Sequence, residues 1–120
     1  MEGMDPLAVL AESRLLPLLT VRGGEDLLGL ARVLEEEGVG ALEITLRTEK
    51  GLEALKALRK SGLLLGAGTV RSPKEAEAAL EAGAAFLVSP GLLEEVAALA
   101  QARGVPYLPG VLTPTEVERA

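Results

Sequence analysis

Polar side chains alternate with apolar ones along the segment from residue 42 to residue 47. Glu43, Thr45 and Arg47 stand between leucine and isoleucine residues, and in a β-strand every second side chain points to the same face. One face of this strand would be apolar, and the other would carry a carboxylate, a hydroxyl and a guanidinium. The planar guanidinium of Arg47 is suited to bind a substrate carboxylate through two parallel hydrogen bonds.

Charged residues on one face are unusual in a parallel sheet, because such sheets are normally covered on both faces. Glu43 and Arg47 would then be two buried ionisable groups, which are rarely buried without partners or a task. Desolvation would raise the pKa of Glu43, whereas a neighbouring cation would lower it. Two simpler explanations stay open from the residues alone: a solvated edge strand, and an ion pair that serves structure only.

A glycine-rich segment further along the chain supplies another candidate. In Gly66–Val70 the glycines permit a close backbone approach or an unusual dihedral angle. Thr69 would lie at the carboxyl end of a strand, which is where barrel enzymes build their active sites. The alternative is a plain turn from strand to helix.

Two prolines are further candidates for substrate contacts. Pro90, within Ser89–Gly91, could form an apolar wall of a pocket, or it could serve the turn alone. Pro17 lies inside the first expected strand. Proline there implies a position that needs no hydrogen-bond donor, and it could contact the interior of a barrel.

The lysines show no sign of a catalytic role. All of them fall in expected helices at the spacing of solvated faces, and none ends a strand: Lys50, Lys56, Lys60 and Lys74. The chain has no Cys and no His. This excludes Cys nucleophiles, His general bases and most zinc sites among these residues.

Apolar runs of strand length alternate with helical patterns along the chain. The expected strands are Leu16–Val21, Ala41–Leu46, Leu63–Ala67, Ala85–Val88 and Tyr107–Val111. The expected helices are Glu25–Glu37, Glu49–Lys60, Pro73–Ala82 and Leu92–Arg103, after a short helix from Asp5 to about Glu12. Glycines mark the helix ends, at Gly38, Gly62, Gly83 and Gly104. Capping boxes mark two helix starts, at Ser72–Glu75 and Thr113–Glu116.

Strands that alternate with helices of about ten residues predict parallel pairing through right-handed crossovers. Five such units fit either a flavodoxin-like doubly wound sheet or the first part of a TIM barrel, the (β/α)8 fold. The sequence stops inside a capped helix, which favours the barrel. The expected fold class is therefore α/β, a TIM barrel. Residues 1–120 would supply, as a single domain, its N-terminal helix and about the first five βα units.

Composition narrows the classes of partner and the location. The net charge of −6 argues against nucleic acid and anionic membranes, which both need a basic surface, but it allows a small anionic substrate. Without a signal peptide, or an apolar run near the ~18 residues of a membrane span, we expect a cytoplasmic protein. The lack of Asn, alongside abundant Glu and Arg, fits a thermophile, and a GC-rich genome would produce part of the same bias.

Four segments together resemble one family: Leu42–Thr48, Gly66–Val70, Val88–Gly91 and Tyr107–Val111. In their order and spacing they resemble the 2-dehydro-3-deoxy-phosphogluconate aldolase / 4-hydroxy-2-oxoglutarate aldolase family. The resemblance implies a class I aldolase, a lyase that belongs to carbohydrate metabolism by the Entner–Doudoroff route. It would cleave 2-dehydro-3-deoxy-6-phosphogluconate to pyruvate and glyceraldehyde 3-phosphate, 4-hydroxy-2-oxoglutarate to pyruvate and glyoxylate, or both.

The resemblance also implies roles for three residues. Glu43 corresponds to the general acid/base of the family, Arg47 to the residue that holds the pyruvyl carboxylate, and Thr69 to a hydroxyl that binds the same carboxylate. The Schiff-base lysine of the family lies on the sixth strand, in a K-F/L-F-P-A stretch that these 120 residues do not contain. Similar proteins use no metal or other cofactor and form homotrimers. We therefore expect this chain alone to be inactive and the activity to belong to a longer protein.

Two other functions stay open at this point. One is another phosphate-binding TIM-barrel enzyme, such as an epimerase or an isomerase. The other is a non-enzymatic, flavodoxin-like binding module. A phospho-receiver of that kind would need an Asp at the end of the third strand, where the sequence has Gly68, Thr69 and Val70.

Overall fold

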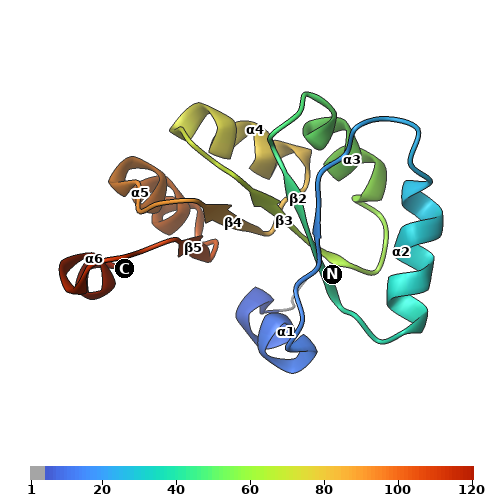
Figure 1. Ribbon diagram of the computed structural model, residues 1–120, viewed down its shortest axis with the longest axis horizontal. Coiled ribbons are helices and arrows are strands. Elements are labelled where there is room, and N and C mark those ends of the chain that lie inside the picture. Colours follow the sequence, from blue (N-terminus) through green and yellow to red (C-terminus); the bar gives the residue numbers. More distant parts are fainter. Residues whose placement is uncertain (1–4) are drawn as a thin grey trace.

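Helices and strands alternate along the computed structural model, which describes residues 5–120 (Figure 1). The strands are β1 (Leu18–Leu19), β2 (Ala41–Thr45), β3 (Leu64–Gly68), β4 (Phe86–Ser89) and β5 (Tyr107–Pro109). The helices are α1 (Pro6–Ser13), α2 (Leu27–Glu36), α3 (Lys50–Leu58), α4 (Pro73–Ala82), α5 (Glu94–Arg103) and α6 (Pro114–Arg119).

The strands form one parallel sheet in the order β1-β2-β3-β4-β5. A doubly wound sheet of the flavodoxin kind reverses its strand order at a switch point, and no reversal occurs here. The flavodoxin-like alternative is therefore wrong for residues 5–120. Five βα units that advance in one direction are consistent with part of a TIM barrel.

Two apolar layers lie on opposite faces of this sheet. The outer layer joins α2 to α5 to the sheet, and its largest fully buried members include Leu42, Ile44, Leu55 and Leu87. The inner layer is smaller and lies under α1, and it consists of Val9, Ala41, Leu64 and Phe86. Figure 1 shows α2 to α5 following one another around one side of the sheet, with α1 apart from them. One face of each strand is thus left for the interior of a barrel.

Helix ends follow the sequence signals, with two exceptions. The Thr113–Glu116 capping box of α6 is complete, with both partners bonded to the backbone. At α4 the Ser72 hydroxyl accepts from the Glu75 amide, but the Glu75 carboxylate accepts from the amide of Arg71 instead of that of Ser72. α3 ends at Leu58, ahead of the expected stop at residue 62.

The first strand is shorter than the sequence predicts. We expected Leu16–Val21, but β1 contains only Leu18 and Leu19. Pro17 therefore precedes the strand instead of lying inside it, because proline has no amide hydrogen with which to extend the ladder. Its carbonyl still accepts the amide hydrogen of Glu43 at 2.9 Å, so Pro17 holds the chain beside β2.

Gly66 leaves the space that the ring of Phe86 occupies on the inner face. These residues are register partners on β3 and β4. A side-chain carbon at residue 66 would collide with the ring, which is fully buried. The inner layer is therefore built around a missing side chain.

Gly66→Ala should lower the free energy of unfolding by about 1–3 kcal/mol, the usual cost of overpacking a core that cannot move. Urea unfolding followed by circular dichroism measures it. Gly91→Ala is the matched control, because an added carbon there meets no atom within 4 Å, and its effect should stay within about 0.5 kcal/mol. Equal stability of the two variants would contradict the packing described here.

Candidate active site

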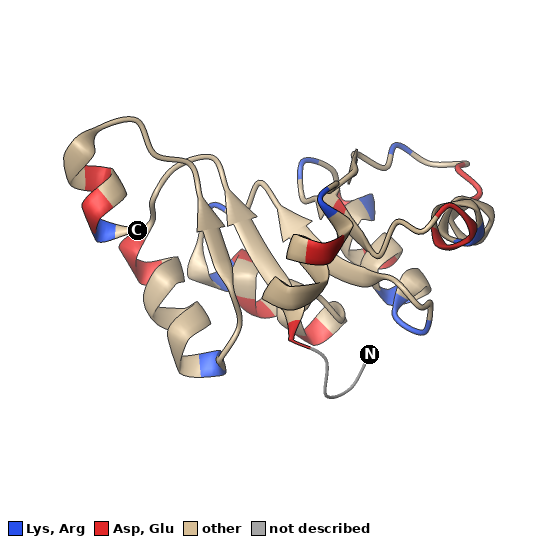
Figure 2. Ribbon diagram, turned by 90° about the horizontal axis from the view of Figure 1, so that it is seen from below, with Lys and Arg blue, Asp and Glu red and all other residues tan. Residues whose placement is uncertain are grey.

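Glu43 is the only charged residue in the five strands of residues 5–120. Figure 2 shows the other charged residues spread over the helices and loops that surround the sheet. The Glu43 side chain is 6% exposed. Its strand neighbours Leu42 and Ile44 belong to the outer layer, so alternation along β2 directs Glu43 to the inner face.

Gly68 has no side chain, and the Glu43 carboxylate occupies the space that this leaves. A side-chain carbon at residue 68 would collide with Oε2 of Glu43, so the carboxylate lies across the backbone at the end of β3. Every fully buried polar side-chain atom of the described residues has a hydrogen-bond partner, but no residue of 5–120 bonds to this carboxylate. Its oxygens therefore keep a narrow opening and are free to accept a hydrogen bond.

Burial decides the ionisation of Glu43. Desolvation raises the pKa of this carboxyl above its usual value of 4.5, and the charge of Arg47 lowers it by less. The sequence left the direction of this shift open. A carboxyl whose pKa moves toward neutrality can both accept and donate a proton under physiological conditions.

Glu43, Thr45 and Arg47 form the polar stripe of β2 and the turn after it. The hydroxyl of Thr45, the middle residue, already has a hydrogen-bond partner. Thr45 is fully buried, and its hydroxyl lies 2.8 Å from the hydroxyl of Thr20. This pair joins the chain after β1 to the end of β2. Thr45 thus stabilises the sheet between Glu43 and Arg47.

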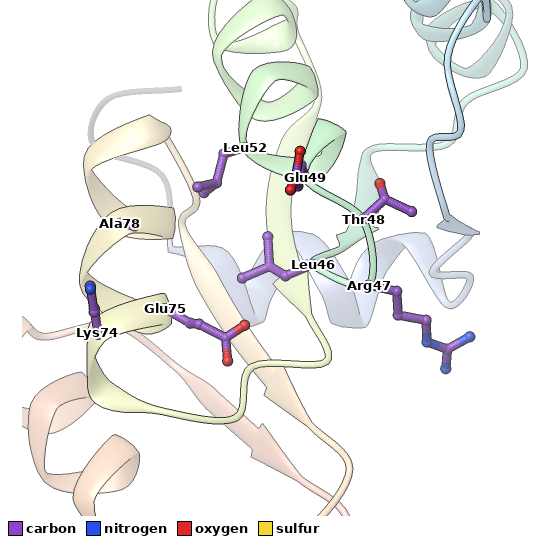
Figure 3. Close-up of a pocket in the computed structure, with 8 residues that line it drawn as sticks. All are labelled: Leu46, Arg47, Thr48, Glu49, Leu52, Lys74, Glu75 and Ala78. Atoms are coloured by element: carbon purple, nitrogen blue, oxygen red, sulfur yellow. The ribbon is translucent and has the colours of Figure 1, made fainter.

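Arg47 lies beyond the end of β2 and is exposed in residues 5–120. The expectation that the stripe buries two ionisable groups is therefore right for Glu43 and wrong for Arg47. The strand stops at Thr45 and the chain turns, which lifts the guanidinium out of the sheet. Figure 3 shows Leu46 pointing toward Leu52 and Arg47 pointing away from them.

Thr69 has a backbone conformation that is costly for its side chain. It lies directly after β3 with a φ of 58° and is 8% exposed. A β-branched residue in the left-handed region is an outlier, and such strain is often kept at functional sites. The turn places Thr69 at the same end of the sheet as Arg47.

The candidate residues meet in one small hollow at the carboxyl ends of the strands. Its volume is about 200 Å³, and it is lined by Leu18, Glu43, Arg47, Thr69, Val88, Ser89 and Pro90. Pro90 is thus part of the wall, whereas Pro17 is not among the lining residues. Leu18 and Val88 were missed by the sequence analysis. Their signal was present, because Leu18 is the register partner of Glu43 and Val88 lies two residues after inward-facing Phe86.

A larger hollow lies outside the sheet, between the first turns of α3 and α4. It measures about 370 Å³, and its lining includes Leu46, Leu52 and Ala78 with Lys74 and Glu75 at its edge (Figure 3). Arg47 lines both hollows, and the other residues that line the larger hollow do not line the inner one.

The four lysines are exposed, and Lys60 falls just after α3 instead of inside it.

Within residues 5–120, no cluster of acidic, Cys or His side chains could hold a metal ion. No helix in this part of the chain has the length and apolar character needed to cross a membrane.

Comparison with known proteins places this geometry in a family. Residues 7–120 match the family model described as KDPG and KHG aldolase. The chain belongs to this family. It is 43% identical to the 2-dehydro-3-deoxy-phosphogluconate aldolase of Treponema pallidum, over 89% of this chain and 52% of the relative. It is 44% identical to the enzyme of that name from Pseudomonas aeruginosa, over 88% of this chain and 49% of the relative.

A solved structure of the family has the same arrangement of helices and strands. The KDPG aldolase of Legionella pneumophila, captured with pyruvate as a covalent carbinolamine intermediate, is 36% identical and superimposes with a TM-score of 0.85. The superposition covers 97% of this chain and 57% of that one. The TIM-barrel fold class is confirmed, and the chain spans about half the length of the curated relatives it matches.

The raised pKa of Glu43 predicts how the stability of this chain responds to pH. The folded state holds the proton more tightly than the unfolded state, so the stability from Glu43 is fully present below pH 4.5 and is lost as pH rises through the raised pKa. Glu43→Gln has no proton to lose. In urea unfolding at a series of pH values, its stability relative to wild type should increase above pH 4.5 and then level off.

Glu25→Gln is the control of opposite sign. Hydrogen bonds from the backbone amide of Arg22, its own amide and that of Gly23 lower the pKa of Glu25 below 4.5. Its contribution is therefore present above pH 4.5 and lost as pH falls through the lowered pKa. A Glu43→Gln variant that loses stability relative to wild type as pH rises would contradict the burial of this carboxylate.

Proposed function

We propose that this chain carries the acid/base and the carboxylate-binding groups of a class I aldolase that cleaves 2-keto acids. The observation that supports this most is the desolvated carboxylate of Glu43, which shares a hollow with Arg47 and Thr69. In this proposal a lysine from the part of the relatives' length that this chain does not span forms the Schiff base.

The chemistry needs an electron sink and a base. The lysine amine adds to the C2 carbonyl to give a carbinolamine, and loss of water leaves an iminium. When the C3–C4 bond breaks, its electron pair moves to the iminium nitrogen and forms an enamine. The proton of the C4 hydroxyl must leave in the same step, which releases an aldehyde. Protonation at C3 and hydrolysis of the imine then give pyruvate and free lysine.

Glu43 is the proposed proton carrier. Its position inside the hollow, with oxygens that no residue of 5–120 bonds, leaves it free for the hydroxyl groups of the substrate and of the carbinolamine. The raised pKa favours a group that must take a proton in one step and return it in another.

Arg47 and Thr69 are the proposed carboxylate clamp. The guanidinium offers two parallel donors, and the hydroxyl of Thr69, which lines the same hollow, offers a third. Because the clamp fixes C1 of the keto acid, C2 and C3 are held at a constant distance from Glu43, which aligns the scissile bond. Pro90 would close the wall.

The proposed substrates are 2-dehydro-3-deoxy-6-phosphogluconate, 4-hydroxy-2-oxoglutarate, or both, in the Entner–Doudoroff route or an allied breakdown of keto acids. Relatives are named for both kinds of substrate, and the Legionella pneumophila enzyme was captured with pyruvate as a covalent carbinolamine intermediate. The proposal includes a homotrimer, which the family resemblance supports, and a thermophilic source, which the composition supports. It also includes a cytoplasmic location, which the relatives' being bacterial metabolic enzymes supports.

Borohydride reduction in the presence of pyruvate tests the Schiff base. The full-length protein that contains these residues should gain the mass of one reduced pyruvyl group on a lysine beyond residue 120. The chain ending at Ala120 should gain none and should show no retro-aldol turnover, because its lysines all lie on exposed surfaces. Labelling of Lys50, Lys56, Lys60 or Lys74, or no labelling of the full-length protein, would overturn the proposal.

Substitutions of Glu43 and Arg47 in the full-length protein should affect different kinetic constants. Glu43→Gln should lower kcat by about 10²-fold or more, the usual scale for a positioned acid/base. Arg47→Ala should chiefly raise KM, by about ten- to a hundredfold, because it removes charged hydrogen bonds to the substrate. Steady-state rates with either keto acid separate the two effects. Wild-type kcat in Glu43→Gln, or an unchanged KM in Arg47→Ala, would remove that residue from its role.

A further inference from the structure

The hydroxyl of Tyr107 lies at the centre of a hydrogen-bond network beneath the β4–α5 loop. It accepts from the amide of Leu93 at 3.1 Å and contacts the hydroxyl of Ser89 and, at 3.3 Å, the carbonyl of Gly91. The Ser89 hydroxyl donates its single proton to that same carbonyl at 2.7 Å. All hydrogen-bond contacts of the Tyr107 hydroxyl are therefore to one loop.

This network encloses Pro90. Ser89 and Gly91 are its two chain neighbours, and both are held through Tyr107. The residue after β5 holds the loop at a second point, since the amide of Gly110 donates to the Ser89 carbonyl at 2.9 Å. A side chain at residue 110 would collide with the carbonyl oxygen of Pro90. The wall of the hollow is thus fastened to β5 at two points.

Tyr107 itself does not reach the hollow. It is the register partner of Leu87, and like Leu87 it packs in the outer layer. Any effect on a ligand must therefore pass through the loop. Pro90 lacks an amide hydrogen, so its own contribution to the hollow is shape alone, and that shape depends on where the loop is held.

We infer that Tyr107 is a positioning residue, which fixes the Ser89–Gly91 loop so that Pro90 closes the pyruvyl end of the keto-acid site. This rests on the proposed function. The hydroxyl is uncharged and does not contact the substrate. It acts by restricting the conformations of the loop, which sets the position of Pro90 in the site.

Tyr107→Phe in the full-length protein tests the inference, because it removes the hydroxyl and keeps the ring. KM for the keto acid should rise about three- to tenfold, on the scale of one or two lost hydrogen bonds, with kcat changed by less. A variant that is merely less stable has fewer folded molecules, which lowers apparent kcat and leaves KM unchanged. Ser89→Ala, which breaks the same network from the other side, should give the same rise in KM.

Ser61→Ala is the matched control. Its hydroxyl also accepts from a backbone amide, that of Leu63 at 3.3 Å, but it lies at the amino end of β3, far from the loop. KM should equal that of wild type. Wild-type pyruvate trapping is measured first. If it is absent, the proposed function fails and the inference fails with it. If trapping is normal and both Tyr107→Phe and Ser89→Ala keep wild-type KM, the positioning role alone is wrong.

Discussion

A carboxylate that leaves water loses its hydration, and the protein must either supply hydrogen bonds or let the group hold its proton more tightly. Glu43 follows the second course. The described residues give it a cation at a distance and no direct donor, so burial dominates its pKa. The pKa of Glu43 therefore depends on the order of the strands, the glycines of β3 and the turn after β2.

The glycines of β3 provide the space in which the Glu43 carboxylate can be buried. In a parallel sheet the inner face of a strand is normally filled by branched side chains, which would leave no room for a carboxylate. The two absent side chains at Gly66 and Gly68 accept one apolar ring and one carboxylate in adjacent layers. Phe86 therefore belongs to the inner apolar layer, whereas Glu43 lines the hollow.

Alternation along the chain predicted much of this arrangement. Local spacing in the sequence indicates the polar stripe on β2, the glycine segment before Thr69 and the alternation of strands and helices. The strand order and the location of Glu43 could therefore be anticipated. Arg47 could not be placed, since its exposure depends on β2 ending at Thr45. The Thr20–Thr45 pair and the Tyr107 network could not be predicted either, because each joins residues that are far apart in the sequence. Contacts of that kind depend on register, which composition and period do not encode.

The left-handed backbone of Thr69 has a consequence for protein engineering. Glycine adopts such a φ at no steric cost, whereas threonine pays for its branched side chain. A library of variants screened by heat resistance alone would therefore enrich glycine at this position. Such a screen would select variants that lack the hydroxyl at the edge of the hollow. These variants would be more stable, but they would lose a group that can contact a ligand.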